Sequence, residues 1–228
     1  MEKVGFIGNY DKIDLIIYTA KVLTQLGKKV LIIDSTENQK TRYIVPSINP
    51  TVSYITEFES IDIAVGFEDL ESVQRYLGVE DELQLNYDYI LFDIDSSIKI
   101  EKMRISNLDR NYFVTAFDLY SLNRGIESLN NLQMPFKLTK IYFTKTFYKE
   151  EDEYLNYLAL GKKIIWNENI IYMPLESGDV TAIAENQRLG KIKFKNLTPD
   201  YKEGIACIIS NITGDAVRII KNTIKILE

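Results

Sequence analysis

The stretch that decides the fold is Gly27-Lys28-Lys29-Val30-Leu31-Ile32-Ile33-Asp34. Its centre, residues 30–33, is a continuous aliphatic run, which is typical of a strand that a parallel sheet covers on both faces. The apolar pattern of residues 15–26 predicts an amphipathic helix just before it, and Gly27 provides a helix stop. A carboxylate, Asp34, follows the strand.

The same alternation of apolar strands and amphipathic helices continues along the chain. It predicts one domain over residues 1–228 with an α/β, doubly wound, mostly parallel sheet and helices on both faces. Residues 35–60 are expected to be irregular, and the chain from about residue 176 is expected to be mostly helical. Within that helical part, residues 191–195 are predicted to form an edge strand with Ile192 and Phe194 facing inward. The remaining predicted elements are strands over 3–7, 89–92, 112–116, 141–144 and 170–173, and helices over 67–77, 119–132 and 149–160.

Composition excludes several classes of function. The chain has no histidine, so Ser-His or Cys-His catalysis and histidine metal sites are excluded. A single cysteine and the lack of a secretory or membrane-spanning apolar segment indicate a cytoplasmic protein. The net charge of -6 disfavours broad nucleic-acid binding, so nucleic acid is not an expected partner.

Ligands of open α/β sheets bind beyond the carboxyl ends of the strands. Three residues stand at such ends here: Gly8, Asp34 and Asp93. The segment Ile7-Gly8-Asn9-Tyr10-Asp11-Lys12-Ile13-Asp14 lies where backbone amides at a helix N-terminus and a lysine could hold phosphate.

Here the chain resembles the MinD/ParA group of P-loop NTPases, whose phosphate loop reads K-G-G-x-G-K-T-T. The group's second strand, G-K-K-V-L-(I/V)-(I/V)-D, corresponds to residues 27–34, and its F/Y-D-x-I-(I/V)-(I/V)-D segment corresponds to residues 87–93. Residues 114–122 and 172–174 resemble later segments of the group. The resemblance implies a nucleotide site of Gly8, Lys12, Asp34 and Asp93, with ATP or ADP and Mg²⁺ as candidate cofactors.

The departures from the family pattern matter as much as the matches. Ile7 replaces the signature lysine, Asn9 and Asp11 replace two loop glycines, Ile13 replaces the threonine that binds magnesium, and Thr36 replaces a second aspartate. Phosphoryl transfer depends on positioning and electrostatic stabilisation, and each lost stabilising donor typically costs about 10²–10³ in rate. We therefore expect no useful ATP hydrolysis, while the identity of any metal stays open.

Each retained residue also has a structural alternative. Lys12 is either a phosphate ligand or a solvated lysine in an exposed turn. Asp34 and Asp93 are either site residues or caps of the loops that follow them.

Residues 215–228 predict a C-terminal amphipathic helix, with Val217, Ile220, Ile224 and Leu227 on one face and basic residues elsewhere. Two interpretations remain: the helix packs on the domain or a protein partner, or it lies on the anionic inner face of a membrane.

Three functions are therefore considered. The first is a non-catalytic MinD/ParA-like protein, with protein partners and as a candidate homodimer, that organises a bacterial division, envelope, pilus or secretion machine; TadZ-like pilus-assembly proteins are one such relative. The second is an active ATP-binding switch, and the third is a ParA-type DNA-partitioning protein, against which the acidic charge argues.

Overall fold

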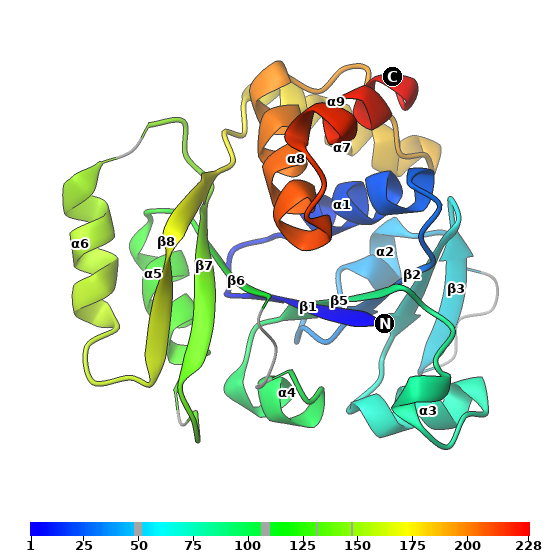
Figure 1. Cartoon of the computed structure of the whole chain (residues 1–228), viewed down its shortest axis with the longest axis horizontal. Helices are drawn as coiled ribbons and strands as arrows, with labels where there is room; N and C mark the ends of the chain where they lie inside the picture. The colour runs from blue at the N-terminus through cyan, green and yellow to red at the C-terminus, as the bar shows by residue number, and fades with distance from the viewer. Residues whose placement is uncertain (48–51, 106–109, 131, 147) are drawn as a thin grey trace.

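The computed structural model describes residues 1–47, 52–105, 110–130, 132–146 and 148–228. Over this part of the chain, strands and helices alternate as a doubly wound α/β fold (Figure 1). The strands are β1 (Glu2–Ile7), β2 (Val30–Asp34), β3 (Tyr54–Phe58), β4 (Ile61–Val65), β5 (Tyr89–Ile94), β6 (Asn111–Thr115), β7 (Phe136–Tyr142) and β8 (Ile164–Tyr172). The helices are α1 (Ile13–Gln25), α2 (Thr41–Ile44), α3 (Leu70–Leu77), η1 (Glu82–Gln84, a 3₁₀ turn), α4 (Ser97–Lys102), α5 (Leu119–Glu127), α6 (Lys149–Leu158), α7 (Ser177–Leu189), α8 (Pro199–Thr213) and α9 (Val217–Ile226).

The eight strands form one sheet in the order β3-β4-β2-β5-β1-β6-β7-β8. All neighbours are parallel except β3 and β4, which form an antiparallel hairpin at one edge. The predicted fold class is therefore confirmed. In the β2–β5 pair Asp34 lies beside Asp93, so two carboxylates end adjacent strands at the same edge of the sheet.

Two apolar layers cover the sheet. Residues of α1, α7, α8 and α9 form the core on one face, and residues of α3, α4, α5 and α6 form the core on the other (Figure 1). The central strands are buried on both faces, as their continuous apolar sequences predict. This arrangement fixes the loops at the carboxyl edge on a rigid platform.

Helix ends follow local capping chemistry. The Asp69 carboxylate accepts a hydrogen bond from the Ser72 amide (2.7 Å) and begins α3, while Gly78 ends it with φ 71°. The Thr198 hydroxyl accepts from the Tyr201 amide (3.3 Å) and Pro199 occupies the first turn of α8. These signals place the helix boundaries.

Several sequence predictions were wrong in detail. Segment 191–195 is not a strand; the chain turns at Gly190, and Ile192 and Phe194 are nevertheless buried, with Phe194 edge-on to Tyr18 at 5.0 Å. The supposedly irregular 35–60 segment contains α2 and β3, and β4 and α4 were missed. Positions 48–51 and 131 of the predicted segments lie outside the described residues.

Candidate nucleotide-binding site

The loop between β1 and α1 lies at the carboxyl edge of the sheet, where a phosphate loop is expected. Gly8 has φ 136°, a conformation that favours glycine, and a Cβ atom there would lie 2.3 Å from the Val114 carbonyl oxygen of β6. The packing of two backbones therefore requires this glycine whether or not a phosphate binds.

Lys12 is buried at the end of this loop and is not a solvated lysine. Its Nζ lies 2.7 Å from Asp93 Oδ1 and donates a hydrogen bond to the Gly8 carbonyl oxygen, also at 2.7 Å. Both side chains are almost fully shielded from solvent, with exposed fractions of 2% for Lys12 and 5% for Asp93. The structure thus brings Gly8, Lys12 and Asp93 together, but it directs the lysine charge at a carboxylate.

The environment of Asp93 opposes its ionisation. Burial raises the pKa of Asp93 to about 7; the Lys12 ammonium acts in the opposite direction, and the neighbouring Asp34 carboxylate adds to the rise. Among the described residues, the partner of the Asp93 carboxylate is the Lys12 ammonium and no backbone amide of the following loop, in contrast to Asp34.

Asp34 caps the loop that follows β2. Its Oδ1 accepts hydrogen bonds from the Thr36 amide (3.1 Å) and hydroxyl (2.6 Å), and its Oδ2 accepts from the Thr41 amide (3.1 Å) and hydroxyl (2.6 Å). Both carboxylate oxygens are thus occupied by the chain itself. Thr36, at the position of the family's second aspartate, supports this cap.

The substituted loop residues are integrated into the fold. Ile7 and Ile13 are buried in the two cores, on opposite faces of the sheet. The Tyr10 ring packs on the Phe143 ring with centroids 4.5 Å apart. Asn9 is half-buried in the same loop.

Asp11 has a cationic partner, Lys40, which lies immediately before α2. Lys40 Nζ lies 2.7 Å from Asp11 Oδ2 and 3.0 Å from Asp14 Oδ2. Sequence reasoning missed Lys40, because it lies in a segment that was predicted to be irregular and no motif marks it.

A cavity of about 430 Å³ adjoins the loop. It is lined by residues of the β1–α1 loop, of the segment after β2, and of the end of β5. The charged groups that line it are three carboxylates, Asp11, Asp93 and Asp95, and two ammonium groups, Lys12 and Lys40. Each of these lysines already forms an ion pair with a carboxylate. Among the described residues that line this cavity, no lysine or arginine is left to receive a phosphate group.

The donor set does not fit the Mg²⁺ ion that the family resemblance implies. Ile13 offers no hydroxyl oxygen, and both Asp34 oxygens accept hydrogen bonds from threonines. The described part of the chain contains no cluster of three or more carboxylate or thiol side chains arranged to hold a metal ion.

The predicted C-terminal helix is α9, which packs against the core beside α1 and α8. Ile220 and Ile224 are buried, and Val217 and Leu227 are half-buried against the same core. The apolar face that was considered for membrane binding is therefore occupied by the protein itself. Within the described residues, no helix combines the length and apolar character needed to cross a membrane.

Comparison with known proteins identifies the fold. No protein-family model matches the sequence, and no curated protein matches it. Among solved structures, the chain is similar to MinD in the MinC:MinD cell division complex of Aquifex aeolicus, with TM-score 0.61, 17% identity, and coverage of 95% of this chain and 97% of that chain.

Two further structures agree. A plasmid partition protein of Borrelia burgdorferi B31 bound to AMPPNP matches with TM-score 0.54 and 14% identity over 92% of this chain and 99% of its own. A ParA family ATPase of Chlorobium tepidum TLS matches with TM-score 0.52 and 15% identity over 98% of this chain and 96% of its own. The chain has the MinD/ParA P-loop NTPase fold.

Proposed function

We propose that this protein is a non-catalytic member of the MinD/ParA group that acts through protein contacts, as an organiser or assembly factor of a bacterial envelope, division, pilus or secretion machine. The observation that carries the proposal is the buried Lys12–Asp93 pair. Lys12, which the family resemblance assigns to phosphate binding, is already paired with the Asp93 carboxylate. The residues around this pair do not supply the oxygen ligands of a magnesium site.

A ligand phosphate would have to displace a carboxylate from the buried lysine and enter a cavity where carboxylates outnumber ammonium groups three to two. The three carboxylates of the cavity would repel the negatively charged phosphate. Water does not screen the buried Lys12–Asp93 pair as it screens a pair at the surface, so the attraction between these two residues that a phosphate must overcome is strong. Nucleotide binding and hydrolysis are both opposed by the same arrangement.

The carboxyl edge also offers a surface for protein partners. Large apolar side chains are exposed after four of the parallel strands: Tyr43 after β2, Ile98 after β5, Leu119 and Tyr120 after β6, and Tyr148 after β7. Of these residues, Tyr43 also lines the cavity beside the β1–α1 loop. Exposed apolar groups on one side of a domain are typical of interaction surfaces. The MinD structure that this fold resembles was determined in complex with its protein partner MinC. A partner protein, or a second copy of the chain, is expected at this edge.

The test is the cellular distribution of a fluorescent fusion of the full chain in its own bacterium. We expect a discrete location that is lost in Leu119→Ser and kept in Leu160→Ser. These leucines are similarly exposed (64% and 71%), but Leu160 lies at the other edge of the sheet, where α6 leads into β8. A uniform distribution of the wild-type fusion would reject the organiser role.

A second variant separates this proposal from the ATP-driven switch. Lys12→Met combined with Asp93→Asn removes the charge of both partners and leaves no phosphate lysine. We expect the folded double variant to keep the wild-type distribution. Loss of the distribution in this variant, with Leu160→Ser unaffected, would favour a nucleotide-dependent switch.

A further inference from the structure

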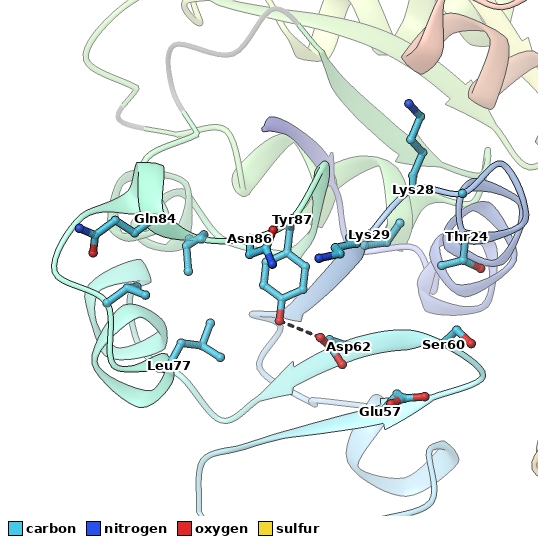
Figure 2. Close-up of a pocket in the computed structure, with 14 residues that line it drawn as sticks. Thr24, Lys28, Lys29, Glu57, Ser60, Asp62, Leu77, Gln84, Asn86 and Tyr87 are labelled. Carbon is cyan, nitrogen blue, oxygen red and sulfur yellow. Dashed lines mark hydrogen bonds between the residues drawn. The ribbon is translucent and has the colours of Figure 1, made fainter.

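A larger cavity, of about 630 Å³, lies at the opposite, amino edge of the sheet (Figure 2). Its walls come from the end of α1 and the start of β2, from the β3–β4 hairpin, and from the segment between α3 and β5. Its volume is in the range of small-molecule sites, which is about 300–1,000 Å³. Neither the family resemblance nor the proposed function uses it.

Two opposite charges face each other across this cavity. The Lys29 side chain extends from one wall towards Tyr87 and Asp62, whereas the neighbouring Lys28 points away from them (Figure 2). Among the described residues, Lys29 Nζ forms no ion pair, with Asp62 or with any other carboxylate. A cation and an anion are therefore presented to one space without neutralising each other directly.

The anionic side is held in place by a phenol. The Tyr87 hydroxyl donates a hydrogen bond to Asp62 Oδ2 at 2.8 Å. Burial and the adjacent Asp62 carboxylate raise the pKa of Tyr87, so this hydroxyl stays protonated and remains a donor. Within the part of the chain that the structure describes, no other hydrogen bond or ion pair of the Asp62 side chain is present, so its remaining lone pairs can accept from a cationic group.

The hairpin that carries Asp62 closes through a two-residue turn, Glu59 and Ser60, between Phe58 and Ile61. Glu59 and Ser60 have φ of 54° and 68°, in the left-handed region that favours glycine. Lys21 Nζ holds the turn by contacts with the Glu59 carboxylate (2.8 Å) and carbonyl oxygen (3.0 Å). Ser60, at the end of this turn, lines the cavity.

The third wall is apolar. Leu85 is buried, and Leu77 and Val79 are half-buried beside it, between α3 and β5. The cavity thus combines one cationic wall, one anionic wall and one aliphatic wall. The charged lining residues are two cations, Lys28 and Lys29, and two anions, Glu57 and Asp62, so a ligand with a single charge meets both attraction and repulsion in this cavity.

We propose that this cavity binds a small zwitterion of the α-amino-acid class with an apolar side chain. Its carboxylate lies at Lys29, its ammonium group at Asp62, and its side chain along Leu77, Val79 and Leu85. This inference is independent of the proposed function at the carboxyl edge.

The test is an NMR titration of the ¹⁵N-labelled full chain with leucine, N-acetyl-leucine and leucinamide. We expect leucine to shift the amide signals of Lys29, Asp62 and Tyr87. Each analogue lacks one charge and is expected to bind about fivefold more weakly, the effect of losing one partly exposed ion pair. Equal affinities for the three compounds, or no shifts at high millimolar leucine, would overturn the proposal.

Matched variants assign the charges. Lys29→Met is expected to weaken leucine about fivefold and to abolish the preference for leucine over leucinamide, because the carboxylate has lost its partner. Asp62→Asn should likewise abolish the preference over N-acetyl-leucine. Lys28→Met, whose side chain lines the same cavity but points away from Tyr87 and Asp62, is the matched control and should weaken leucine binding much less than Lys29→Met does (Figure 2). An equal loss in Lys28→Met and Lys29→Met would show a non-specific surface charge effect and contradict the site.

Discussion

Lys12 Nζ lies 2.7 Å from Asp93 Oδ1 in the interior of the carboxyl edge, and this pair determines what the loop can do. A P-loop lysine neutralises phosphate charge in active members of the fold class. Here the neutralising partner is a residue of the chain, delivered by the adjacent strand β5. The positive charge of Lys12 is consequently neutralised within the protein and is not offered to a phosphate group.

The first prediction concerns this pair. Above about pH 8, where Asp93 is ionised, Lys12→Met leaves the buried carboxylate without its cation, so we expect the free energy of unfolding to fall by about 3 kcal/mol. Adding Asp93→Asn should restore most of the loss, since an uncharged pair has little desolvation cost. Urea denaturation of both variants measures this; equal destabilisation by the single and double variants would show that the two residues do not interact.

The second prediction concerns pH. The pKa of Asp93 is raised from 3.8 to about 7, so the folded state binds a proton that the unfolded state releases. The stabilisation from this proton is fully present below about pH 4 and is lost as pH rises through 7. As the pH rises from about 4 to about 7, the unfolding free energy of the wild type should therefore decrease relative to that of Asp93→Asn. A difference that rises with pH would contradict the assigned direction.

The third prediction concerns the Asp34 cap. Asp34→Asn replaces one of two oxygens that each accept two hydrogen bonds, leaving the Thr36 or Thr41 donors unpaired. We expect a loss of about 2–3 kcal/mol in thermal or urea unfolding. Asp95→Asn is the control, because among the described residues the Asp95 side chain accepts one hydrogen bond, from the Glu37 amide (2.8 Å), and the change should cost less than about 1 kcal/mol. Similar losses for both variants would refute the special role of Asp34.

The fourth prediction concerns α9. Ile220→Ala removes a fully buried side chain and should cost about 2–5 kcal/mol, whereas Ile226→Ala, at 72% exposure, should stay within about 0.5 kcal/mol. Because the apolar face of α9 is packed on the core, the intact protein is expected not to float with anionic liposomes. Flotation that disappears on removal of residues 215–228 would instead support the membrane interpretation.

The sequence allowed the fold class to be predicted because continuous apolar strands and helix stops such as Gly27 are local signals. It did not reveal β4 or the true course of residues 191–195. Ile192 and Phe194 alternate as strand residues do, yet they are buried by contacts with α1 and α7 that no local pattern encodes.

The site divides in the same way. The capping alternative for Asp34 could be stated from its position after a strand, and the structure shows that cap. The partners of Lys12 and Asp11 could not be predicted. Asp93 and Lys40 reach them from segments more than 25 residues away, and only the parallel order of the sheet brings β1 beside β5.

The most direct measurement is calorimetric titration of the full chain with ATP in the presence of Mg²⁺, beside a variant that carries Asn9→Gly, Asp11→Gly and Ile13→Thr. These changes restore the family loop around Lys12. The account predicts no heat of binding for the wild type at millimolar nucleotide, and stronger binding by the restored variant. Magnesium-dependent binding by the wild type that is lost in the Lys12→Met, Asp93→Asn double variant would contradict the central claim and identify a working nucleotide site.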